Sequence, residues 1–144
     1  MAELSKSMVS FRIEGEDLSP AQISRILGAS PTEARTKGEK IVGRKTGTVR
    51  SAKPGSWRLE ASVRAPADMN GQIQELLDQM TDDLGAWQSL TRKYHADLFC
   101  GLFMRGSDEG LTIFARHLAA LGSRGIELGL CLYAPTADNG QAGA

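Results

Sequence analysis

Apolar residues recur along this chain at two different periods, and the order in which the two periods alternate constrains the fold more than any other feature. Apolar and polar side chains alternate over Val9–Ile13, which predicts a half-buried strand. Ile23–Leu27 follows with helical spacing, between the helix-starting pair Ser19-Pro20 and the helix-ending Gly28. Alternation returns over Trp57–Val63 and predicts another strand that faces the core.

The second half of the chain repeats this change of period. Ile73–Leu90 has the apolar spacing of a helix with a break in its middle, so a kinked helix or two helices are expected. Asp97–Met104 is apolar on both faces, which is typical of a central strand, and Ile126–Tyr133 alternates as a final strand. Between them, a last helix is expected to follow its cap at Gly106–Asp108. The apolar stripe of this helix consists of Leu111, Phe114, Leu118 and Leu121.

The resulting order is β-α-β-β-α-β-α-β, which indicates the α+β class. We expect a two-layer sandwich: a mostly antiparallel sheet with helices on one face. The first six elements match the split βαβ, ferredoxin-like arrangement, and an extra helix and strand extend this core. A chain of 144 residues suits one domain, which we place at residues 8–135, with a flexible N-terminus at 1–7 and a disordered tail at 136–144.

Residues 32–58 differ in character from the rest of the chain. They carry eight cations against two acids, are interrupted by glycines and Pro54, and predict one or two short strands joined by a long basic loop. This imbalance is typical of a solvated loop or of a contact surface for an acidic protein. Nucleic acid is disfavoured because Trp57 is the only aromatic residue in the segment. The candidate partner-binding residues are Arg35, Lys37, Arg44, Lys45, Arg50, Trp57 and Arg58.

Overall composition excludes several classes of protein. Seventeen basic residues balance seventeen acidic ones, which argues against a protein built to grip phosphate backbones. No apolar run reaches the length that spans a bilayer, and the first ten residues do not form a signal peptide. The only two cysteines, Cys100 and Cys131, lie in apolar runs and are expected to be buried free thiols. A disulfide between them stays open if their strands are neighbours, and reduced thiols favour the cytoplasm.

A phosphate-binding loop is nearly matched by Gly38–Thr46. The motif requires a lysine directly after its second glycine, and here Arg44 separates Gly43 from Lys45. The motif also opens a helix, whereas the residues that follow are polar and glycine-containing. The sequence therefore predicts a loop here and no nucleotide site.

Other catalytic arrangements are weak for similar reasons. His95 and His117 have no nucleophile and orienting acid at suggestive spacing, and Cys100 sits in the most apolar strand, where a thiolate is disfavoured. The acids of the long helical stretch fit a solvated face. They are Glu75, Asp78, Asp82 and Asp83. We predict no catalytic residue, no cofactor and no metal site.

Several short pieces, in this order, resemble a bacterial family known as domain of unknown function 4279. The pieces are Phe11-Arg12-Ile13, Ser19-Pro20, Ile23–Gly28, Pro31-Thr32, Lys37-Gly38-Glu39, Ser56-Trp57, Leu118–Gly122, Ile126-Glu127-Leu128 and Tyr133. The resemblance covers about Met8 to Pro135. It implies no activity, cofactor or catalytic residue, and it is compatible with a partner-binding role, for example as an immunity protein that neutralises a toxin.

The function predicted from the sequence is a non-enzymatic protein-interaction module that uses the basic segment. The alternative is a small-ligand-binding or enzymatic domain with a pocket between sheet and helices, lined by Trp57, Arg58 and Tyr133. The partner's identity and the oligomeric state are not readable from the sequence.

Overall fold

The computed structural model describes residues 4–43, 47–51 and 54–135. The strands are β1 (Lys6–Gly15), β2 (Glu33–Arg35), β3 (Lys40–Val42), β4 (Val49–Ser51), β5 (Gly55–Glu60), β6 (His95–Phe103) and β7 (Glu127–Tyr133). The helices are α1 (Pro20–Leu27), α2 (Met69–Gln79), α3 (Leu84–Lys93) and α4 (Ala115–Arg124).

The main sheet has the order β2-β5-β1-β6-β7. β1 is antiparallel to both of its neighbours, β5 and β6, and β2 is antiparallel to β5. β2 therefore runs parallel to β1 with β5 between them, which is a split βαβ unit. β7 is added parallel to β6 through the crossover helix α4. The α+β class, the mostly antiparallel sheet and the extension by one helix and one strand are confirmed.

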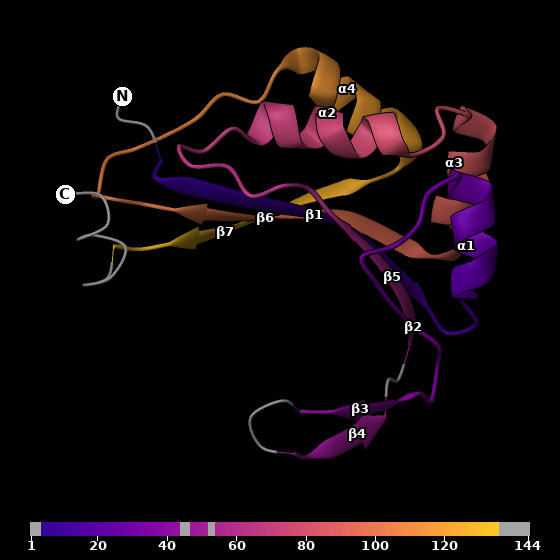
Figure 1. The fold of residues 1–144 in the computed structure, drawn as a ribbon. Helices are drawn as coiled ribbons and strands as arrows, with labels where there is room; N and C mark the ends of the chain where they lie inside the picture. Colours follow the sequence, from indigo (N-terminus) through magenta and orange to yellow (C-terminus); the bar gives the residue numbers. More distant parts are fainter. Residues whose placement is uncertain (1–3, 44–46, 52–53, 136–144) are drawn as a thin grey trace.

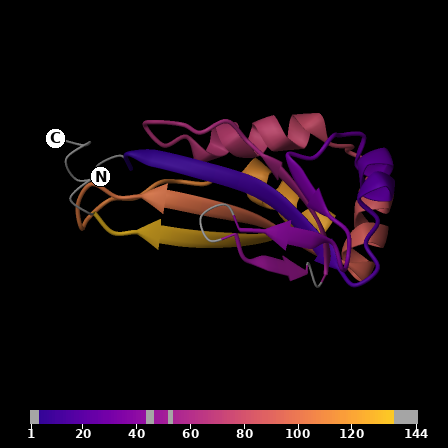
Figure 2. The ribbon, with the colours of Figure 1, turned by 60° about the horizontal axis from the view of Figure 1, so that its bottom comes forward.

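The helices lie on one side of this sheet. Figure 1 shows α2 and α4 over one face, with α1 and α3 beside each other at the end of the sheet where β1 ends. β3 and β4 form a separate hairpin on the opposite side, and Figure 2 shows this hairpin in front of the uncovered face. Among the residues that the structure describes, no helix covers this second face of the sheet.

The space between sheet and helices is filled by large side chains. Phe11 of β1, Trp57 of β5 and Trp87 of α3 are fully buried, and the Phe11 ring meets the two indoles edge to face at centroid distances of 5.9 and 5.5 Å. The Trp57 indole N–H donates to Ser24 Oγ at 3.0 Å, and that of Trp87 donates to the Thr81 carbonyl at 2.7 Å. Replacing such a side chain with alanine costs about 3–5 kcal/mol.

α4 begins later than the sequence predicted. Its first residue is Ala115, and Phe114 at the N-cap makes no side-chain capping bond. The cap comes instead from α2, where Asn70 Oδ1 accepts from the Phe114 N–H at 2.9 Å. The predicted stripe is therefore wrong: Leu111 and Phe114 precede the helix, and of the two stripe residues inside it only Leu121 is buried. A cap supplied from another helix leaves no local signal.

The N-terminal boundary of the domain also differs from the prediction. Leu4 is buried, the Ser5 N–H donates to the Phe103 carbonyl at 2.9 Å, and Ser7 is fully buried in β1. Residues 4–7 therefore belong to the domain and not to a flexible N-terminus. Residues 1–3 and the predicted tail at 136–144 lie outside the described residues.

The basic segment contains more strand than the sequence predicted. β2 extends the main sheet, and β3 pairs with β4 in a hairpin. The hairpin turn is closed by the Gly43 N–H, which donates to the Thr48 carbonyl at 2.8 Å, and by Gly47 at φ 68°, a backbone conformation that favours glycine. A strand follows these glycines where a phosphate-binding loop would open a helix. The loop predicted for Gly38–Thr46 is wrong at Lys40–Val42, which form β3.

Candidate functional site

The candidate site is the uncovered face of the sheet, which we call the open face. One half of this face is apolar. Met8 and Tyr133 are 43% and 40% exposed there, and Phe103 lies between β1 and β7 as a half-buried ring. Tyr133 stacks on Phe103 with ring centroids 4.6 Å apart. Gly101 allows this arrangement, because a Cβ at that position would approach the Tyr133 ring to 3.2 Å.

The other half of the open face carries charges that are paired with one another. Arg12 forms two hydrogen bonds with Asp97, at 2.9 and 2.7 Å, and the bond to Asp97 raises the pKa of the guanidinium. Arg58 lies between Glu33 and Glu60 and contacts the Glu60 carboxylate at 2.6 Å. Exposed pairs of this kind contribute little stability, about 0–1 kcal/mol each, so they mainly neutralise this half.

A small hollow joins the two halves. Its volume is about 160 Å³. It is lined by Met8, Phe99, Phe103, Tyr133 and Val63 on the apolar side, and by Arg58 and Glu60 on the charged side. Pockets for small molecules usually measure about 300–1,000 Å³, so this hollow suits a side chain of a macromolecule better than a whole metabolite.

The hairpin adds a second exposed surface on the same side of the sheet. Val42 of β3 and Val49 of β4 pair across the strands and are 60% and 56% exposed. The sequence from Lys40 to Ser51 contains four cations and no acid. The hairpin therefore presents exposed valines in a basic stretch of sequence, on the side of the sheet away from the helices (Figure 1).

The predicted partner-binding residues do not form one exposed surface. Trp57 is fully buried on the helix side of β5, so it cannot contact a partner and is removed from the predicted surface. Arg58 lies on the open face in the ion pairs described above. Arg35 pairs with Glu33 at 2.7 Å, and Lys37 pairs with Glu16 at 2.5 Å, which raises the lysine pKa.

The remaining predicted residues are Arg44, Lys45 and Arg50. Arg50 lies in β4, and nothing is described for its side chain. Arg44 and Lys45 fall outside the described residues. Met8, Phe99 and Phe103 were missed, because an apolar residue on a strand gives no sign of whether a helix covers its side of the sheet.

The cysteines do not form a reactive pair. Cys100 pairs with Leu130 across β6 and β7, whereas Cys131 pairs with Gly101, so the two thiols lie on opposite faces of the sheet and both are free. The disulfide left open by the sequence is thus excluded. Burial raises the pKa of Cys100 to about 12, which keeps it protonated. Cys131 is half-buried on the open face, so the prediction of two buried thiols is wrong for this residue.

A groove of about 520 Å³ between α2 and α4 contains His117. The ring is buried, with Nδ1 2.9 Å from Asn70 Oδ1 and Nε2 3.1 Å from Gln74 Oε1. Burial and the nearby Arg116 lower the pKa of His117. Gln74 in turn donates to Asp78 at 2.7 Å. Both contacts of the ring are to amide oxygens, and a neutral imidazole donates through only one ring nitrogen, so only one of them is a hydrogen bond. The polar side chains face one another and do not converge on a ligand position.

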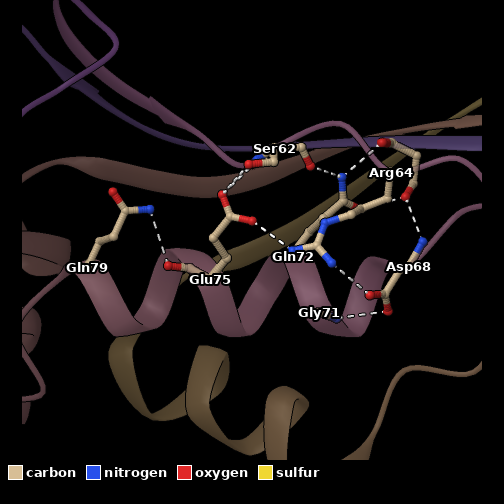
Figure 3. Close-up of polar contacts among 8 residues, drawn as sticks. Ser62, Arg64, Asp68, Gly71, Gln72, Glu75 and Gln79 are labelled. Atoms are coloured by element: carbon tan, nitrogen blue, oxygen red, sulfur yellow. Dashed lines mark hydrogen bonds and ion pairs between the residues drawn. The ribbon is translucent and has the colours of Figure 1, made fainter.

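Figure 3 shows a second polar network, which fixes α2 against the sheet. Gln72 is fully buried, accepts from Ser7 Oγ at 2.5 Å, and donates to the carbonyls of Ser7 and Ser62 at 2.9 Å each. Glu75 accepts from the Ser62 backbone N–H at 2.7 Å and pairs with Arg64 at 2.9 Å. The Ser62 bond is the main cause of the lowered pKa of Glu75, so its predicted place on a solvated face is wrong. This network is fully paired and positions a helix.

No group of three or more His, Cys, Asp or Glu side chains in residues 4–43, 47–51 and 54–135 could hold a metal ion. Over the same ranges, no helix has the length and apolar character needed to cross a membrane.

The fold and its open face define a small α+β domain with a ferredoxin-like core, an inserted hairpin and an added parallel strand. The chain belongs to the family described as Domain of unknown function (DUF4279), whose model matches residues 4–135. This match confirms the resemblance seen in the sequence. No curated protein and no solved structure matches the chain significantly.

Proposed function

We propose that this protein is a non-enzymatic protein-interaction module that binds a protein partner on the open face. The observation that carries the proposal is the apolar half of that face, where Met8 and Tyr133 stay about two-fifths exposed beside the stacked Phe103. Interfaces between proteins are centred on such aromatic and methionine side chains, surrounded by a polar rim. The paired charges around Arg12 and Arg58 supply the rim.

The charge of the hairpin supports an acidic rim on the partner. Among the cations of the basic segment, Arg35, Lys37 and Arg58 already have carboxylate partners, so they add little net attraction. Arg44, Lys45 and Arg50 lie in a stretch of sequence without acids, and we propose that these residues steer the partner toward the open face.

A nucleic-acid partner is less well supported, although aromatic rings line the open face. Lys6 lies over the Phe103 ring at 4.2 Å from its centroid, and Tyr133 stacks on the same ring. Arg12 lies over Phe99 at 4.8 Å. Bases bind such rings by stacking on their faces, and Arg12, Lys6 and the stacking of Tyr133 on Phe103 already occupy part of this aromatic surface. The alternative of a ligand pocket between sheet and helices has lost its support, because Phe11, Trp57 and Trp87 fill that space.

The test compares two glutamate variants of matched exposure. Met8→Glu changes the open face, and Leu84→Glu changes an equally exposed leucine on α3. Tagged protein captures partners from its native lysate, and the captured protein is then purified and titrated against each variant by calorimetry. We expect Met8→Glu to weaken binding at least tenfold and Leu84→Glu to leave it unchanged.

Equal affinity for both variants would contradict a site on the open face. A third variant with Arg44 and Lys45 changed to serine should slow association and reduce its dependence on salt. Binding of a single-stranded oligonucleotide that weakens steeply with salt would instead support the nucleic-acid alternative.

A further inference from the structure

The two edges of the main sheet differ in how they are protected. β2, at one edge, is only three residues long and carries Glu33 and Arg35. β7, at the other edge, is seven residues long, and Glu127 at its start is its only charged residue. Proteins usually block long edge strands with lysine, proline, a bulge or a covering segment, because an exposed edge pairs with other strands. β7 has no lysine and no proline.

The outer edge of β7 presents backbone groups for pairing. The Tyr133 carbonyl accepts from the Met104 N–H on the β6 side at 3.0 Å. Because backbone groups alternate in direction along a strand, the N–H and C=O groups of Leu128, Leu130 and Leu132 point to the outer side. Within the part of the chain that the structure describes, no strand pairs with β7 on that side.

The side chains at this edge are also left uncovered. Leu130 and Leu132 point to the helix side of the sheet, yet they are 51% and 62% exposed. The buried Ile126 lies between α4 and β7, and the far end of β7 extends beyond the part of the sheet that α4 covers (Figure 1). An apolar edge of this kind is a liability for a protein that stays monomeric.

We propose that β7 pairs antiparallel with β7 of a second copy of this chain, so that two sheets join into one. This inference concerns a surface other than the open face and does not depend on the proposed function. A twofold axis at Leu130, the middle of the strand, brings Leu130 opposite Leu130 and Leu128 opposite Leu132 of the second copy. All of these residues have outward backbone groups, so each pair exchanges both N–H···O bonds.

The side chains are self-complementary in this register. Leucines meet leucines on the helix side, where the exposed apolar area is removed from water. On the open face, Glu127 lies opposite Tyr133 of the second copy, so the two carboxylates stay at opposite ends of the interface. Gly129 lies opposite Cys131, which places the bulkier side chain next to a position without one. This complementarity favours a second copy of the chain over an unrelated strand.

The first test is sedimentation of the purified full chain from about 1 µM to about 1 mM, a range that spans weak and moderate affinities. We expect a species of twice the chain mass of 15.5 kDa for the wild type. Leu132→Lys should give a monomer with an unchanged circular dichroism spectrum, because Leu132 is already 62% exposed. Leu84→Lys, on α3, is the control and should remain dimeric.

The second test fixes the register with cysteines. In a Cys100→Ala, Cys131→Ser background, which also removes the thiol that pairs with position 130 across β6 and β7, Leu130→Cys should form a disulfide between copies under mild oxidation. The two Cα atoms would be about 5.5 Å apart. Leu132→Cys should not form one, since its nearest counterpart would be far beyond the roughly 7 Å limit. A monomeric wild type at the highest concentration, or a dimer that survives Leu132→Lys, would overturn the proposal. Crosslinking of Leu132→Cys instead of Leu130→Cys would overturn the register.

Discussion

Replacing Gln72 with methionine tests whether the buried polar network holds α2 on β1. Methionine keeps nearly the same volume, so the cavity left behind is small. The substitution removes the hydrogen bonds from Ser7 Oγ and to the Ser7 and Ser62 carbonyls. The Ser7 carbonyl keeps the Arg64 N–H as a partner at 3.2 Å, and the Ser7 hydroxyl oxygen still accepts from the Asp68 N–H at 3.0 Å. The groups left unpaired are therefore the Ser7 O–H donor and the Ser62 carbonyl.

The loss of stability expected for Gln72→Met follows from these contacts. A buried polar group that loses its partner costs about 1–3 kcal/mol, and Ser7 is fully buried whereas Ser62 lies near the surface. We therefore expect Gln72→Met to lower the free energy of unfolding by about 2–4 kcal/mol. The melting temperature should fall by roughly 2–4 °C for each kcal/mol lost. Urea unfolding followed by circular dichroism measures this change, because the midpoint shifts at constant slope.

Gln79→Met is the matched control on the same helix. Gln79 is exposed and donates only to the Glu75 carbonyl at 3.2 Å, so its replacement should change the stability by less than about 0.5 kcal/mol. Combining Gln72→Met with Ser7→Ala should cost less than the sum of the single changes, with a coupling energy of about 0.5–3 kcal/mol. A loss below about 1 kcal/mol for Gln72→Met, or strict additivity, would refute the reasoning.

Three further predictions concern acid stability, backbone geometry and thiol reactivity. The folded state lowers the pKa of Glu75, so the stability that this carboxylate contributes is fully present above its ordinary pKa of 4.5 and is lost as the pH falls through its folded pKa. The difference in stability between wild type and Glu75→Gln should therefore shrink when unfolding curves are measured at increasingly acid pH. Gly125→Ala should destabilise the protein by about 2 kcal/mol, because φ is +81° and the new Cβ would clash with the Thr91 side chain. Gly122→Ala, where the new Cβ meets open space, should stabilise it by about 0.5–1 kcal/mol, and the midpoints of urea unfolding measure both changes. Cys131 should react with a thiol reagent in the native state and Cys100 only after unfolding, and equal native rates for the two would contradict the assigned faces.

The order of the elements could be predicted because each depends on a local pattern. The ends of α1 are an example: Ser19 accepts from the Gln22 N–H, and Gly28 adopts the left-handed conformation, as these residue types favour. The start of α4 could not be predicted, because Asn70 caps it from a different helix. The sequence pattern is read one element at a time, so contacts between elements far apart in the chain stay hidden.

The open face, which we propose as the site, could not be predicted from the sequence for the same reason. Strand alternation correctly separates Trp57 from Arg58, but it cannot assign which side the helices cover. Once α2 and α4 cover one face, Trp57 becomes a core residue, and the outward-pointing Phe99 and Phe103 of β6 become the floor of the open face. Charge density alone was also misleading, because Arg35 finds its carboxylate partner within its own strand and Arg58 finds its partners within its own and the adjacent strand.

The two proposed surfaces are connected through β7. Tyr133 and Cys131 belong to this strand and lie on the open face, so pairing at β7 would continue that face across both copies. A partner that presents two matching surfaces would then bind both copies, and the second contact would benefit from a high effective concentration. The affinity of a bivalent partner should therefore fall in Leu132→Lys, although this change leaves the apolar half of the open face intact. A partner that binds one copy at a time should have the same affinity for wild type and Leu132→Lys. Calorimetric titration of both proteins, which gives affinity and stoichiometry, therefore separates bivalent binding from binding to single copies.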